Sequence, residues 1–186
     1  MNLQFFSKSF IAGVFISVGA ASFLSIGMPF GPLVFCFGLI SVILTGSNLF
    51  TGKSGFATGR DLLFLIPMLL LNGVGCWSLA LMFDFDVSGI IDKRLTTDAL
   101  ILFGRSVITG IIMTVSVYYA RERRNWLPLV FGIPAFIVSG LPHCVADIFY
   151  YCVAGLKASF ILPWLISVAG NFVGCNFHRI LRIPLP

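Results

Sequence analysis

The segment that decides the fold interrupts a long apolar stretch in the second half of the chain. It reads Val138-Ser139-Gly140-Leu141-Pro142-His143-Cys144-Val145-Ala146-Asp147. A proline inside a helix removes one backbone hydrogen bond and clashes with the preceding turn. The sequence therefore predicts that a helix breaks close to Pro142 and starts again beyond it.

The composition of the chain places this break inside a membrane protein. Of its 186 residues, 58% are hydrophobic and 10% are charged, and the mean hydropathy is +1.02. A soluble domain carries about 25% charged residues. The apolar composition excludes a disordered chain, and five cysteines are too few and odd in number for a disulfide scaffold. No basic cluster alternates with aromatic residues, which argues against nucleic-acid binding.

Six apolar stretches approach the length of about 20 residues that a bilayer-crossing helix needs. They are Phe10–Ile26, Pro32–Phe50, Leu62–Phe83, Leu100–Ala120, Leu127–Val153 and Phe160–Phe177. Because the connections are short, we predict an all-α membrane protein with one transmembrane domain over residues 1–186. Its predicted partners are the lipid bilayer and a small solute.

A second predicted break occupies the matching place in the first half. The second stretch ends in Leu44-Thr45-Gly46-Ser47-Asn48-Leu49-Phe50-Thr51-Gly52-Lys53-Ser54-Gly55. Gly46 and Gly140 are 94 positions apart, about half the chain length. We therefore predict two halves of three spans, about 1–92 and 93–186, inverted relative to each other because three is odd. Interrupted spans in corresponding positions indicate a transport site, and half-helix ends favour anions.

The basic residues predict the orientation of the six spans. An even number of spans puts both termini on one side, together with eight basic residues, against three on the other side and Arg105 within a span. The eight are Lys8, Lys53, Arg60, Arg121, Arg123, Arg124, Arg179 and Arg182, and the three are Lys93, Arg94 and Lys157. Positive charge is retained on the cytoplasmic side. We predict cytoplasmic termini in a prokaryotic inner (plasma) membrane.

Four motifs together resemble the formate/nitrite transporter family over nearly the whole chain. They are Ser-Lys-Ser-Phe-Ile-Ala-Gly-Val-Phe-Ile at 7–16, Thr-Gly-Ser-Asn-Leu-Phe-Thr at 45–51, Ser-Gly-Leu-Pro-His-Cys-Val-Ala-Asp-Ile-Phe at 139–149 and Gly-Asn-Phe-Val-Gly at 170–174. The resemblance implies six helices in an aquaporin-like inverted repeat, with the second and fifth helices broken. It also implies a homo-oligomer, a pentamer with one pore in each protomer.

The resemblance further implies roles for individual residues. His143 matches the central pore histidine, and Thr51 matches the loop threonine that hydrogen-bonds it. Leu49 and Phe136 match the outer apolar constriction, and Phe35 and Leu39 match the inner one. Either Lys93 or Arg94 matches a vestibule lysine that attracts anions.

Three positions depart from the family pattern. Pro142 replaces a glutamate before the histidine, Gly110 stands where the fourth helix has asparagine, and Asp147 replaces an asparagine. Asp147 is either a partner for His143 or an interface residue at a helix end. A purely structural role is the alternative for each pore residue: His143 as a histidine packed in the core, and Thr51 as a residue that caps a helix.

Chemistry points to transport and away from catalysis. Among the cysteines and the two histidines, no metal-ligand spacing occurs, and no nucleotide-binding or catalytic motif is present. We therefore expect neither an enzyme nor a cofactor.

A charge at the bilayer centre costs at least about 2.5–3.5 kcal/mol, so a proton should accompany an anion past apolar rings. The hypothesis is a pore for formate, nitrite, hydrosulfide or similar anions. The alternatives are an aquaporin-like pore for water or neutral solutes, and a structural protein with a degenerate site.

Overall fold

The computed structural model describes residues 2–185, and this part of the chain is helical with no strand. Four helical segments are long and apolar enough to cross a membrane: α1 (Leu3–Ile26), Gly59–Ala80, α6 (Ala99–Glu122) and Ala158–Cys175. The second contains α4 (Leu65–Ala80) after a 3-10 turn, and the fourth contains α9 (Ile161–Cys175) after a shorter one. A helix of 24 residues is about 36 Å long, enough to cross the hydrocarbon core.

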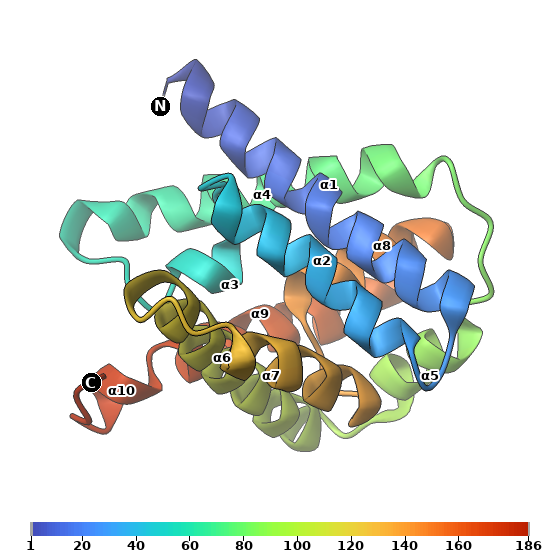
Figure 1. Ribbon diagram of the computed structural model, residues 1–186. Coiled ribbons are helices and arrows are strands. Elements are labelled where there is room, and N and C mark those ends of the chain that lie inside the picture. Colours follow the sequence, from blue (N-terminus) through green and yellow to red (C-terminus); the bar gives the residue numbers. More distant parts are fainter. Residues whose placement is uncertain (1, 186) are drawn as a thin grey trace.

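Two shorter helix pairs lie between these long segments. The first pair is α2 (Gly31–Leu44) and α3 (Phe50–Lys53), and the second is α7 (Leu127–Val138) and α8 (Cys144–Val153). The short α5 (Ser88–Thr96) and α10 (Phe177–Ile180) complete the fold. Both ends of the described chain lie on the side of α10, and α5 lies on the other side (Figure 1).

The helices α2 and α7 end with the same backbone hydrogen bonds. Gly46 has φ +63° and Gly140 has φ +66°, a left-handed conformation that favours glycine. The N–H of Gly46 donates to Ile43 O and that of Ser47 to Val42 O. The equivalent bonds, from Gly140 to Ile137 O and from Leu141 to Phe136 O, lie 94 positions later. Each helix therefore ends in a Schellman motif.

The long helices pack in two equivalent pairs, α1 against α4 and α6 against α9. Glycines allow the close approach. A Cβ on Gly13 would overlap the backbone of Asn72, and a Cβ on Gly110 would overlap the backbone of Asn171. Around this packed interior the outer surface is apolar, with side chains such as Ile66, Leu100 and Phe131 more than two-thirds exposed. Such a surface suits lipid or a neighbouring protomer better than water.

Candidate functional site

His143 lies at the start of α8, where its imidazole caps the helix. Its Nδ1 accepts a hydrogen bond from the N–H of Ala146 at 3.2 Å, and its Nε2 lies 2.9 Å from Thr51 Oγ1. Because Nδ1 accepts, this network assigns the ring proton of the neutral imidazole to Nε2. His143 therefore donates to the Thr51 hydroxyl, which keeps its own proton for another acceptor.

Thr51 comes from the other half of the chain, 92 positions before His143. It lies in α3 and is fully buried, and His143 is 2% exposed. The hydrogen bond that the sequence led us to expect between the two residues is present. It joins the two interrupted helix pairs in the middle of the protein.

Two asparagines stabilise the segments that separate α2 from α3 and α7 from α8. The Asn72 side chain donates to Ser9 O and Asn48 O, and it accepts from Phe50 N. The Asn171 side chain donates to Ser106 O and Pro142 O, and it accepts from Cys144 N. Each asparagine thus ties the restart of a short helix to a neighbouring long helix.

Sequence reasoning missed Asn72 and quoted Asn171 only within a motif. A signal was available, because each asparagine is followed three positions later by a glycine, Gly75 or Gly174. A Cβ on Gly75 would overlap Phe10 O, and a Cβ on Gly174 would overlap Val107 O. The pattern Asn-x-x-Gly therefore marks the same contact in both halves.

Four apolar side chains that the resemblance assigned to the constrictions, Phe35, Leu39, Leu49 and Phe136, are all buried. The rings of Phe35 and Phe136 meet edge to face with centroids 6.1 Å apart, and Phe136 stacks on His143 at 5.8 Å. Leu39 and Leu49 instead line one small cavity with Gly52 and Val117.

This grouping differs from the one expected from the sequence, which paired Phe35 with Leu39 and Leu49 with Phe136. Residues four apart share a helix face but are separated by about 6 Å along the helix axis. Phe35 and Leu39 therefore lie at different depths on α2. The structure pairs Phe35 with Phe136 and places Leu39 beside Leu49.

A cavity of about 230 Å³ lies beside α5 and reaches His143; we call it the α5-side cavity. Phe23, in the last turn of α1, and Met28, just beyond that helix, line its wall together with Phe136. Lys93 and Arg94 both line it, but in different states. Lys93 is exposed, whereas Arg94 is 7% exposed and its Nε lies 3.2 Å from Asp147 Oδ1.

Asp147 is therefore the partner of Arg94 and not of His143. Its carboxylate oxygens lie 3.2 and 3.3 Å from Arg94 Nε. Both nitrogens of His143 already have other partners, Ala146 N and Thr51 Oγ1. The possible His143–Asp147 contact is absent because Asp147, in the first turn of α8, reaches the guanidinium from α5 instead.

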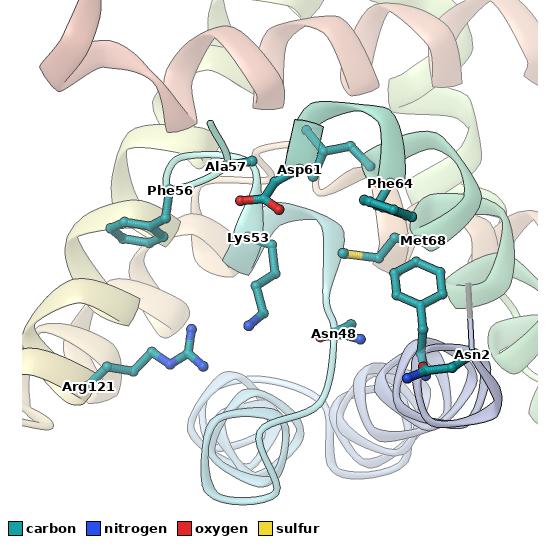
Figure 2. Close-up of a pocket in the computed structure, with 11 residues that line it drawn as sticks. Asn2, Asn48, Lys53, Phe56, Ala57, Asp61, Phe64, Met68 and Arg121 are labelled. Atoms are coloured by element: carbon teal, nitrogen blue, oxygen red, sulfur yellow. The ribbon is translucent and has the colours of Figure 1, made fainter. Parts of the chain in front are cut away.

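A larger cavity of about 790 Å³ opens near the start of α1 and beside α3; we call it the α3-side cavity (Figure 2). Phe5, Asn48, Lys53, Asp61 and Arg121 are among its lining residues. Lys53 and Arg121 also line the small cavity at Leu39 and Leu49, so they stand at the junction of the two. Sequence reasoning used these two cations only for orientation.

Comparison with known proteins identifies the family of this chain and solved structures with the same fold. A family model described as "Formate/nitrite transporter" matches residues 2–182. The chain belongs to the formate/nitrite transporter family. A search of curated proteins returned no match. Among solved structures, an "FNT family ion channel" superposes with a TM-score of 0.82 at 23% identity, covering 98% of this chain and 91% of that one. A "Pentameric formate channel with formate bound" gives 0.80 at 18%, covering 96% and 94%.

Membership of the formate/nitrite transporter family makes this chain a relative of channels and transporters. Two of its departures from the family pattern have a local structural explanation. Gly110 faces α9, where a Cβ would overlap Asn171 O, so no larger residue fits at that position. Pro142 lies between α7 and α8 and needs no N–H there, while its carbonyl accepts from Asn171. The residue before the histidine thus contributes a backbone carbonyl to the site, where the family pattern has a glutamate side chain.

Proposed function

We propose that the chain is a channel for small monovalent anions or their conjugate acids, such as formate, nitrite or hydrosulfide. The observation that carries this proposal is the buried His143–Thr51 hydrogen bond between a basic cavity on each side. The permeant would pass from the α5-side cavity between Phe35 and Phe136. It would then meet the polar pair and leave past Leu39 and Leu49 into the α3-side cavity.

The proposed transmembrane topology has six spans in an inverted repeat. In it, α2 with α3 forms the second span and α7 with α8 forms the fifth. Support comes from the Schellman ends of α2 and α7 and from the two equivalent asparagines. We also propose a homo-oligomer with a pore in each protomer, a pentamer by analogy with the "Pentameric formate channel". The exposed apolar surface would then be shared between lipid and neighbouring protomers.

The proposed mechanism follows from the cost of moving charge through the apolar rings. A bare anion pays the full penalty of leaving water, whereas a neutral acid crosses far more easily. Lys93 attracts the anion, and the Thr51 hydroxyl donates a hydrogen bond to it at the centre. His143 fixes that hydroxyl as a donor. Because its Nδ1 is already bonded to Ala146 N–H, the proton for the permeant comes from water in the cavity and not from the imidazole.

A second candidate is an aquaporin-like pore for water or small neutral solutes. One observation favours it: Arg94, the buried cation nearest the interruption between α7 and α8, is neutralised by Asp147. A pore with little net charge concentrates anions less and so gives them less advantage over neutral molecules.

Flux in proteoliposomes tests these two functions directly. We expect formate and nitrite flux well above that of protein-free liposomes, and faster flux at the lower of two pH values because more of the permeant is protonated. Glycerol should cross no faster than in protein-free liposomes. Glycerol flux without formate or nitrite flux would favour the neutral pore. Absence of flux for all three solutes would contradict the anion channel and a neutral pore that admits glycerol.

The orientation is open to a separate test. A reporter that is active only in the cytoplasm, fused after Pro186, should be active, since eight basic residues lie on the side of the termini. A matching fusion within 84–86, before α5, should be inactive. The reverse pattern would overturn the proposed orientation and place the α3-side cavity outside the cell.

The Phe35–Phe136 constriction predicts a change in selectivity. Phe136→Ala should widen the path beside His143 and raise glycerol flux above that of protein-free liposomes, which is the level expected for the wild type. Removal of a buried phenylalanine costs about 3–5 kcal/mol of stability, so flux is normalised to assembled protein. Phe131→Ala is the matched control, because Phe131 lies on the same helix but is 69% exposed. Unchanged glycerol flux in Phe136→Ala would place the constriction elsewhere.

A further inference from the structure

Arg94 bridges the interruption between α7 and α8. Its Nη1 donates to Gly140 O at 2.9 Å and its Nη2 to Leu141 O at 3.4 Å, both at the end of α7. Its Nε donates to Asp147, in the first turn of α8. Every guanidinium nitrogen thus has a partner, and the three partners lie on both sides of His143 in the sequence.

The same contacts cancel the charge of Arg94. Its side chain is 8% exposed and that of Asp147 is 1% exposed, and the pair is the one ion pair found over residues 2–185. Lys93, the next residue on α5, is exposed and makes no side-chain hydrogen bond or ion pair in the same described range. Since the other lining residues of the α5-side cavity carry no formal charge, Lys93 alone gives it a net positive charge.

We propose that Asp147 limits how strongly this end of the pore attracts anions by neutralising Arg94. This inference rests on the proposed anion channel. An arriving anion meets one effective cation, Lys93, while Arg94 acts as a positioning residue that holds the end of α7 against the start of α8. Asp147 thereby keeps a second cation, already placed at the cavity wall, from attracting the permeant.

Four variants separate the charge of Asp147 from its structural role. Asp147→Asn exposes the charge of Arg94, and Arg94→Gln/Asp147→Asn restores a neutral pair. Lys93→Gln removes the remaining cation. Asp92→Asn removes a carboxylate from an exposed position on the same helix and serves as the matched control. The measured quantities are the half-saturating formate concentration and the maximal flux in proteoliposomes.

Asp147→Asn should lower the half-saturating concentration by about twofold to fifteenfold. This is the Coulomb effect of one charge at roughly 10 Å in water or at an effective dielectric constant of about 20. The decrease should shrink as salt is added. Lys93→Gln should raise the half-saturating concentration, and the double variant should match the wild-type value even if its maximal flux falls. Asp92→Asn should change it less than about twofold at physiological ionic strength.

The inference is overturned if Asp147→Asn and the double variant have the same half-saturating concentration, or if Lys93→Gln leaves it unchanged. Lys93 is exposed, so Lys93→Gln remains readable if Asp147→Asn does not assemble. Lack of formate and nitrite flux in the wild type would instead contradict the proposed function. The two failures are therefore distinguishable.

Discussion

His143→Phe should lower formate flux by at least about tenfold, because the Thr51 hydroxyl would lose the partner that fixes it as a donor to the permeant. An unsatisfied buried polar group costs about 1–3 kcal/mol, and every 1.4 kcal/mol added to the barrier is a factor of ten in rate. Phenylalanine removes both the Nε2 contact with Thr51 and the Nδ1 contact with Ala146 N–H. The measurement is formate flux per assembled protein at two pH values.

Two further variants separate the pore role of His143 from its capping role. Asparagine is a good N-cap, so His143→Asn should preserve the start of α8. Its side chain is too short to keep the hydrogen bond to Thr51. Its flux should remain low although the assembly is intact. Thr51→Val, which removes the hydroxyl at nearly constant volume, should lower flux as well, and Thr51→Ser should retain it. Wild-type flux in His143→Phe would refute the histidine-centred mechanism, whereas a retained pH response is expected because the permeant takes its proton from water.

The all-helical class and the places where α2 and α7 end were the predictable parts of this fold. Gly46, Gly140 and Pro142 are local signals, because left-handed backbone and a missing N–H are properties of single residues. The all-helical membrane class followed from composition, and the resemblance led to the contact between Thr51 and His143. Local chemistry and composition were sufficient for the helix ends and the membrane class, whereas the contact between Thr51 and His143 required the resemblance.

Contacts between distant segments were not predictable in the same way. Phe35 and Leu39 share a face of α2, but their depth relative to Phe136 and Leu49 depends on how α2 and α7 pack. The sequence left Lys93 and Arg94 open because it does not show which side chain of α5 faces α8. In the structure Asp147 pairs with Arg94. Its spacing of four residues from His143, about one helical turn, did not suggest this partner.

Asn72→Ala and Asn171→Ala should both destabilise the protein strongly and to a similar extent. Each side chain is fully buried and makes three hydrogen bonds to backbone groups. Alanine leaves one N–H and two carbonyls without these partners, at about 1–3 kcal/mol for each group that stays unsatisfied. The thermal midpoint of the assembled protein in mild detergent measures this loss, and flux per assembled protein measures its effect on the pore.

The two variants should lower flux by affecting different partners of the His143–Thr51 hydrogen bond. Asn72→Ala releases the N–H of Phe50, next to Thr51, whereas Asn171→Ala releases the N–H of Cys144, next to His143. Each loosens one partner of the central hydrogen bond. Asparagine-to-aspartate changes at these positions should be no better, because a carboxylate cannot donate to the two carbonyls and would be buried with an unpaired charge.

Asn125→Ala provides the matched control for both variants. Asn125 is exposed, and its side-chain oxygen accepts one backbone hydrogen bond, from Leu127 N at 3.0 Å. Loss of one exposed hydrogen bond costs about 0.5–1.5 kcal/mol, so its thermal midpoint should fall only slightly and its flux should be retained. If either Asn72→Ala or Asn171→Ala behaves like Asn125→Ala, that asparagine does not hold its interruption. The two halves would then be stabilised by different contacts despite their equivalent helix ends.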